Sequence, residues 1–191
     1  MNKINFTLED IEKCEEFASK VNTSLYAQRN QFDADKRKKD AKIGKLGELA
    51  VYYSLKDKYP NITYPDFKIY TAKEKSWDFD LKDTSFNLHV KTQDIVQGAK
   101  YGESWIFQHG GGQSKHYDKE IFDMISPNQY VSFVCVDLLK NEGYVKAIVK
   151  LNFLHEEKLF SLPKLFKLQN ANKLAVYYKD LEKYPDQLNA L

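Results

Sequence analysis

The stretch WDFDLKDTSFNLHVKTQD, residues 77–94, carries acidic, basic and amide groups at spacings that could support catalysis. Asp78 and Asp80 are separated by one residue. After a short polar turn, an apolar run carries three further polar groups at alternate positions: His89, Lys91 and Gln93. Carboxylates can hold a metal ion, and a lysine beside them can orient a water molecule or neutralise negative charge. The stretch therefore gathers acid, imidazole, amine and amide groups on two short segments that are otherwise apolar.

A β-hairpin would bring these groups together. Aspartate is common at turns, so Asp83–Thr84 is a reasonable two-residue loop. This loop would place Lys82 opposite Ser85 and Asp78 opposite His89, and alternation along each strand would put the acids and the basic residues on one face. The apolar side chains would share the other face: Phe79, Leu81, Leu88 and Val90. The alternative interpretation is an amphipathic hairpin whose polar face is only solvated.

A further carboxylate stands in an apolar setting on the preceding helix, which is expected over residues 40–57. Glu48 has apolar or aromatic residues three, four and seven positions further along, all on its own side of the helix. A glutamate with such neighbours normally needs a partner. The alternatives are that its side chain extends outward to solvent or that it pairs with Lys45.

Three short motifs, in this order, resemble the PD-(D/E)XK nuclease superfamily. They are GKLGELAVYYSL with Glu48, WDFDL with Asp78, and HVKTQ with Lys91. The resemblance covers roughly residues 40–137. It implies a restriction-endonuclease-like core with elements in α-β-β-β-α-β order. The chain departs from the family at His89, because the residue two positions before the lysine is usually acidic.

The resemblance implies a Mg²⁺ site in which Mn²⁺ could substitute. The implied metal ligands are Asp78 as the main one, Asp80, Glu48 directly or through water, and the backbone carbonyl of Val90. An imidazole such as that of His89 could also bind a metal, although Mg²⁺ prefers oxygen. An alternative metal-binding aspartate is Asp66, which follows Pro65.

The catalytic residues implied by the resemblance are Asp78, Lys91, Glu48, His89 and Gln93. Lys91 would orient or help to deprotonate the attacking water and stabilise charge at the phosphate. Gln93 would position Lys91 or contact DNA.

The surrounding pattern predicts an α/β (α+β) fold with a mixed central sheet flanked by helices. Helical spacing over LEDIEKCEEFASKV, with a capping box at Thr7 and Asp10, is followed by a second short helix over 24–32. The expected strands are ITYPDFKIY, SWDFDL, NLHVKTQ, SWIFQ, YVSFVCVDL and YVKAIVKL, interrupted by a helix or loop at 117–126. NKLAVYYKDLEKY is expected to form a strand and then a helical turn. We expect one domain: a helical extension over 1–38, a core over 39–137 and C-terminal elements over 138–191.

Two segments are candidates for nucleic-acid contacts. The first is a basic run just before the Glu48 helix, whose candidate residues are Lys36, Arg37, Lys39, Lys42 and Lys45. The second is the glycine-rich stretch after SWIFQ, whose candidates are Gln108, His109, Gly111, Gln113, Ser114, Lys115 and His116. The alternatives are a solvated helix face and a mobile surface loop. Trp105 and Phe107 are expected to pack within the sheet.

The 191 residues carry a formal net charge of only +2, so any affinity for nucleic acid must come from local clusters. No apolar run is long enough to span a bilayer, and the first residues are too polar for a signal peptide, so a cytoplasmic protein without membrane contact is expected. The resemblance implies a metal-dependent endonuclease acting on double-stranded DNA, most simply a restriction-type enzyme working as a homodimer. The alternatives are a structure-selective repair, recombination or phage nuclease, a non-catalytic nucleic-acid-binding protein, and an interaction domain whose resemblance is accidental.

Overall fold

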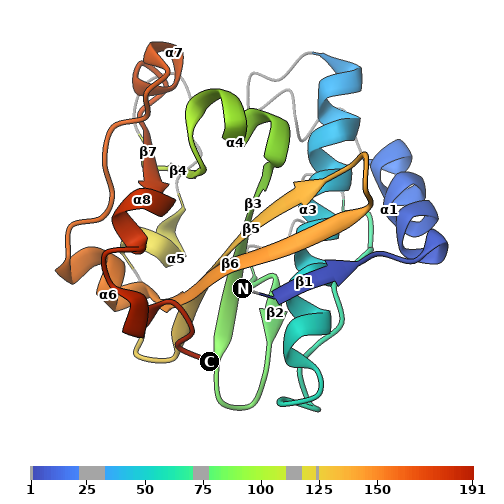
Figure 1. The fold of residues 1–191 in the computed structure, drawn as a ribbon, viewed down its shortest axis with the longest axis horizontal. Helices are drawn as coiled ribbons and strands as arrows, with labels where there is room; N and C mark the ends of the chain where they lie inside the picture. Colours follow the sequence, from blue (N-terminus) through green and yellow to red (C-terminus); the bar gives the residue numbers. More distant parts are fainter. Residues whose placement is uncertain (1, 22–32, 71–77, 111–117, 124) are drawn as a thin grey trace.

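The main sheet is mixed and has five strands. The computed structural model describes residues 2–21, 33–70, 78–110, 118–123 and 125–191 (Figure 1). The sheet order is β1 (Asn2–Asn5), β6 (Glu142–Lys150), β5 (Gln129–Asp137), β3 (Asn87–Asp94) and β2 (Leu81–Lys82). β3 and β5 are parallel, and the other neighbours are antiparallel. The predicted mixed sheet flanked by helices is therefore confirmed.

α3 (Ala34–Leu55) covers one face of this sheet, and α1 (Leu8–Lys20) packs beside α3 (Figure 1). The predicted capping box starts α1, since the Asp10 N–H donates to Thr7 Oγ1 at 3.1 Å and the Thr7 N–H donates to Asp10 Oδ2 at 2.9 Å. Apolar side chains of α1, α3, β2, β3 and β5 form the first buried cluster. This layer fixes the position of Glu48 relative to the hairpin.

A second layer lies on the opposite face. It contains a two-stranded antiparallel sheet of β4 (Ser104–Gln108) and β7 (Lys173–Tyr177). The shorter helices are α4 (Ile95–Tyr101), α5 (Lys119–Phe122), α6 (Leu151–Glu156), α7 (Phe166–Gln169), α8 (Tyr178–Leu181) and the 3₁₀ helix Pro185–Gln187. Trp105 and Phe107 are fully buried here, as predicted. β5 is buried on both faces, and this explains its nearly continuous apolar sequence.

α3 approaches β3 very closely at one position. A Cβ atom built on Gly47 would lie 1.8 Å from the Oγ1 atom of Thr92, so no other residue fits without movement. By contrast, a Cβ atom on Gly44, one turn earlier in the same helix, would meet nothing within 4 Å. Glu48 follows Gly47 directly, so this contact also sets the height of its carboxylate over the sheet.

The predicted α-β-β-β-α-β order is wrong in detail. Within the described part of the chain, two strands rather than three lie between α3 and α4, because ITYPDFKIY forms no strand. Among the described residues, one backbone–backbone hydrogen bond joins this segment to the sheet: the Thr63 N–H donates to the Lys82 carbonyl at 2.7 Å, and Pro65 has no N–H to extend the ladder. The expected N-terminal helical extension instead begins with β1, an edge strand of the main sheet.

Other predicted elements have simpler outcomes. The helix expected over 40–57 begins six residues earlier, at Ala34, with Asp33 as its N-cap. α4 was not anticipated, although Asp94 caps it by accepting a hydrogen bond from the Val96 N–H at 2.9 Å. The helix expected over 24–32 lies outside the described residues. Within the described ranges, no helix has both the length and the apolar character needed to span a bilayer.

Candidate active site at the sheet edge

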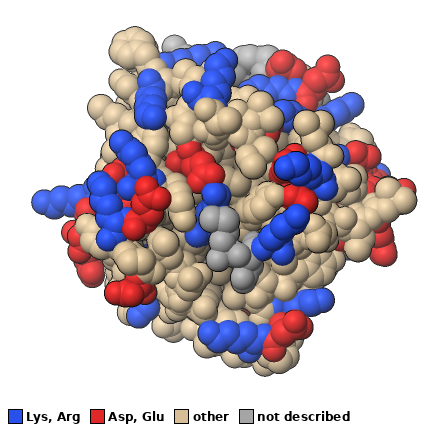
Figure 2. Space-filling model, in the orientation of Figure 1, with Lys and Arg blue, Asp and Glu red and all other residues tan. Residues whose placement is uncertain are grey.

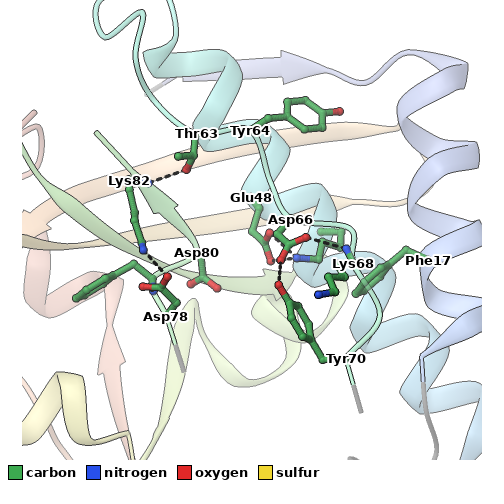
Figure 3. A pocket seen from close by; sticks show the side chains of 12 residues that line it. Phe17, Glu48, Thr63, Tyr64, Asp66, Lys68, Tyr70, Asp78, Asp80 and Lys82 are labelled. Carbon is green, nitrogen blue, oxygen red and sulfur yellow. Dashed lines mark hydrogen bonds and ion pairs between the residues drawn. The ribbon is translucent and has the colours of Figure 1, made fainter. Parts of the chain in front are cut away.

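Acidic side chains from three segments meet in a pocket of about 340 Å³ beside β2 (Figure 3). Its acids are Glu48, Asp66, Asp78 and Asp80, and its lysines are Lys45, Lys68 and Lys82. The remaining lining residues are Phe17, Thr63, Tyr64, Tyr70 and Phe79. Figure 3 shows Asp80 between Asp78 on one side and Glu48 and Asp66 on the other. The pocket thus gathers oxygen ligands and cationic groups in one place.

Glu48 is the buried acid of the pocket. Its residue surface is only 8% exposed, and its two carboxylate oxygens accept hydrogen bonds from Lys45 Nζ at 2.6 and 2.9 Å. Burial raises the pKa of Glu48 to about 8 despite this lysine, and the nearby Asp80 and Asp66 charges contribute to the rise. A buried carboxylate needs a partner, and for Glu48 this partner is Lys45.

Asp80 lies at the open edge of β3. Its Oδ2 atom accepts a hydrogen bond from the Val90 N–H at 2.7 Å. The N–H and C=O of one strand residue point to the same side of the strand, so the Val90 carbonyl also faces this edge. A carboxylate and a backbone carbonyl are therefore available side by side, next to the buried Glu48.

The predicted hairpin register is wrong by two residues. Leu81 pairs with Leu88 and Lys82 pairs with Asn87, so the loop has four residues, 83–86, and is closed by the Asp83 N–H donating to the Phe86 carbonyl at 2.9 Å. The Asp83 carboxylate holds the loop by accepting hydrogen bonds from the backbone N–H and hydroxyl of Ser85. Asp78 is consequently not paired opposite His89.

The alternation of side chains between the two faces of a strand does not extend to Asp78 and Asp80, because both residues precede β2. β2 begins at Leu81, so Phe79 does not keep to the apolar face predicted for it, and its ring centroid lies 4.7 Å from that of His89. The Asp78 carboxylate instead forms an ion pair with Lys82. The hydrogen bond that the Lys82 ammonium donates in this pair lowers the pKa of Asp78. Only Leu81, Leu88 and the partly buried Val90 pack in the first buried cluster as expected.

The three polar residues of β3 do not line the pocket. Lys91 Nζ lies 3.1 Å from Asp118 Oδ2 and 4.8 Å from the centroid of the Phe107 ring, in the second layer. Gln93 Oε1 accepts a hydrogen bond from the Ser104 N–H at 2.9 Å and so anchors the start of β4. His89 has a pKa lowered by burial, and its Nε2 atom has no hydrogen-bond partner among the residues that the structure describes.

The structure therefore divides the predicted cluster into two groups. Asp78 and Asp80 share the pocket with Glu48, whereas His89, Lys91 and Gln93 lie on the other side of β3. No solved structure, curated protein or family model matches this chain. The assignment of roles in this pocket consequently depends on its chemistry and geometry alone.

Three pocket residues were given little or no role by the sequence: Asp66, Lys68 and Lys82. Asp66 comes from the irregular segment before β2 and accepts a hydrogen bond from the Lys68 N–H at 2.8 Å. Its carboxylate also binds the Tyr70 hydroxyl, and this bond raises the pKa of Tyr70. Two signals pointed to this set: the Pro65–Asp66 pair, and the acid-x-lysine spacing of Asp80 and Lys82.

The donor set of the pocket fits a hard cation, because all of its acidic ligands are oxygen atoms. Within the described ranges, however, no three His, Cys, Asp or Glu side chains are placed to hold a metal ion together. The acids are instead held by internal partners, as Glu48 is by Lys45 and Asp78 is by Lys82. A bound cation would have to replace at least the Lys45 ammonium at Glu48.

The predicted basic run is largely neutralised by acids of the same protein. Three of its lysines lie 2.5 to 2.7 Å from a carboxylate other than Glu48: Lys36 with Asp40, Lys39 with Asp94, and Lys42 with Glu15. Lys45 pairs with Glu48, and Arg37 lies in the first turn of the same helix. These pairs reduce the charge that this helix could offer to phosphates.

The glycine-rich segment is described only at its edges. Gln108 Nε2 donates to the Ala171 carbonyl at 3.3 Å, and the His109 ring packs edge-on against Phe122 with centroids 4.8 Å apart. Both candidate residues are therefore engaged within the second layer. The other candidates lie outside the described residues: Gly111, Gln113, Ser114, Lys115 and His116.

Glu48 gives the metal-free protein an expected pH dependence. Its pKa is about 8 in the folded chain against an ordinary value of 4.5, so between these values only the folded state holds the proton. The free energy of unfolding should therefore fall as pH rises from about 5 to 8, with a slope of up to about 1.4 kcal/mol per pH unit from this group.

Urea unfolding in EDTA at several pH values measures this slope. Glu48→Gln should remove most of it, and Glu156→Gln, at an exposed position, should leave it intact. Equal slopes for Glu48→Gln and the unmodified protein would show that Glu48 is already ionised in the folded state.

Proposed function

We propose that this protein is a metal-dependent nuclease that hydrolyses phosphodiester bonds in double-stranded DNA, with its active site in the carboxylate pocket. The observation that carries the proposal is the meeting of Asp80, Glu48 and Asp66 at the open edge of β3. Glu48 comes from α3, Asp66 from the irregular segment after it, and Asp80 from the residue directly before β2, so their meeting is a product of the fold. The resemblance of the motifs supports the same reaction.

Asp80, the Val90 carbonyl and Glu48 would hold the metal ion once the cation had replaced the Lys45 ammonium at Glu48, and Asp66 would have to move toward them to complete the site. The bound Mg²⁺ or Mn²⁺ would supply a water of lowered pKa and neutralise charge at the phosphate. Glu48, whose pKa lies near 8 without metal, would release its proton when it binds the cation.

Lys82 is placed to orient the attacking water, whereas Lys91, the lysine that the family resemblance implies, would first have to leave the other side of β3. Lys82 lines the pocket beside Asp78 and Asp80, whereas Lys91 follows Val90 on β3 and is held by Asp118. Loss of cleavage in Lys91→Ala alone would assign the role implied by the family resemblance. Loss in Lys82→Ala alone would assign that role to the pocket.

The test is cleavage of plasmid and phage DNA by the purified protein with Mg²⁺ or Mn²⁺, beside the same reactions in EDTA. We expect metal-dependent cleavage, and discrete fragments would indicate a restriction-type enzyme acting at defined sequences. Preference for branched or flapped substrates would favour a repair or recombination nuclease. Cleavage that persists in EDTA would contradict the proposed chemistry.

A second candidate function is nucleic-acid binding without catalysis. His89 stands where the family usually has an acid, and the pocket acids Glu48 and Asp78 are paired with lysines of the same chain. A folded protein that binds DNA but cleaves none of these substrates with either metal would favour this alternative.

A further inference from the structure

The C-terminal segment 158–179, KLFSLPKLFKLQNANKLAVYYK, contains five lysines and no aspartate or glutamate. It includes α7 and β7. Among the residues that the structure describes, Lys164 and Lys167 are exposed and have no carboxylate within ion-pair distance. This segment therefore differs from the basic run on α3, where four lysines are neutralised by acids of the same chain.

α4 continues this basic region. A Cβ atom built on Gly102, which directly follows α4, would lie 3.2 Å from Lys164 Nζ, so the α7 segment reaches the end of α4. The helix itself, IVQGAKY, contains Lys100 and no acid. In Figure 2 basic side chains gather at the top of the view, over the region where Figure 1 places α4 and α7.

Exposed apolar side chains lie among these lysines. Phe166 is 70% exposed, Leu162 is 65% exposed and Val96 on α4 is 57% exposed. Single exposed apolar side chains are normal, but several of them close together on a surface are typical of an interaction site. Alternating lysines and apolar groups suit a polyanion with flat hydrophobic parts, because lysines bind phosphates and apolar side chains contact sugars and bases.

We propose that this surface binds the sugar-phosphate backbone of DNA and is the main nucleic-acid contact of the protein. The α4–α7 surface consists of Val96, Lys100, Leu162, Lys164, Phe166 and Lys167. The proposal rests on the proposed function for its choice of ligand. β3 connects the two regions, since it carries Val90 beside the pocket and leads directly into α4.

Binding of a fluorescent 20-base-pair duplex, measured across a range of salt concentrations in EDTA, tests this surface without any cleavage. The double variant Lys164→Gln/Lys167→Gln should bind more weakly. The slope of log K against log salt should become shallower by about 1.8, because each lost phosphate contact removes about 0.9. Phe166→Ser should weaken binding while leaving the slope unchanged.

The matched control is Lys20→Gln/Lys183→Gln, which changes the net charge equally. Both of these exposed lysines are paired with acids, Glu16 and Asp180, on other parts of the surface. The control should keep the salt slope of the unmodified protein. Equal losses in both double variants, or no loss in either, would overturn the assignment of the surface. Binding to phosphatidylserine vesicles without binding to DNA would overturn it as well.

Failure of this inference can be distinguished from failure of the proposed function. If the unmodified protein cleaves DNA with Mg²⁺ while the Lys164→Gln/Lys167→Gln variant binds DNA normally, only the assignment of the α4–α7 surface is wrong. If the surface lysines control binding but no metal supports cleavage, the surface stands and the nuclease proposal fails.

Discussion

Asp80→Asn is expected to lower metal-dependent DNA cleavage at least about a hundredfold, since even residues that only support metal ligands cost up to that factor when replaced. The asparagine carbonyl can still accept the hydrogen bond from the Val90 N–H, so the sheet edge should keep its geometry. What is lost is the negative charge between Glu48 and Asp78. The variant therefore separates the chemistry of the pocket from its folding.

Initial rates of plasmid nicking at fixed Mg²⁺ measure the effect. Asp57→Asn makes the same chemical change at an exposed position beyond the end of α3 and should cleave normally. A parallel measurement is thermal unfolding with and without Mg²⁺. When the free Mg²⁺ concentration is about a hundred times its dissociation constant, Mg²⁺ binding stabilises the folded state by about 2.7 kcal/mol. Asp80→Asn should lose this stabilisation. An Asp80→Asn protein with normal cleavage would place the metal elsewhere.

Gly47→Ala is expected to have the largest effect on stability, with a cost of about 3 kcal/mol or more. The added methyl group would lie 1.8 Å from Thr92 Oγ1 and 2.8 Å from Thr92 Cγ2, so α3 must move away from β3. Glu48 moves with the helix, and cleavage should fall even at temperatures where the variant is folded. The stability of one helix–strand contact and the activity of the pocket are thus expected to change together.

Gly44→Ala provides the matched control, because it makes the same substitution three residues earlier in the same helix. Nothing lies within 4 Å of the new methyl group, so the better helix propensity of alanine should stabilise the protein by about 1 kcal/mol. Urea unfolding curves compare the two variants. Thr92→Ala should partly rescue Gly47→Ala, since it removes two of the three crowded atoms. Equal changes in the free energy of unfolding for Gly47→Ala and Gly44→Ala would refute the close contact between α3 and β3 at Gly47.

The regular elements could be predicted because their sequence periods are strong. β3, β5 and β6 follow apolar runs bounded by turn residues, and the capping box marked the start of α1. The hairpin loop was not predictable in the same way, because the polar residues at 82–85 suit a loop of two or four residues. The side chain of Asp83 binds Ser85 and so selects the longer loop.

The candidate site was only partly predictable for a different reason. Glu48, Asp78 and Asp80 lie on elements or beside motifs that the sequence reveals, but Asp66 comes from a segment without periodicity. Its position depends on Thr63, which bonds to Lys82 across the chain. The ion pairs that neutralise the α3 lysines could not be predicted from the sequence either, because partners such as Glu15 and Asp94 are distant in sequence.

The pairing of β1 with β6 has a consequence for synthesis of the protein. Asn2 faces Val145 in this ladder, so during synthesis β1 must wait for a partner strand that lies more than a hundred residues later in the chain. Contacts of such long range slow folding. α1 follows β1 directly and supplies Phe17 to the carboxylate pocket. A chain that had not yet formed β6 would therefore lack the strand that holds β1, and with it the support that places Phe17 in the carboxylate pocket.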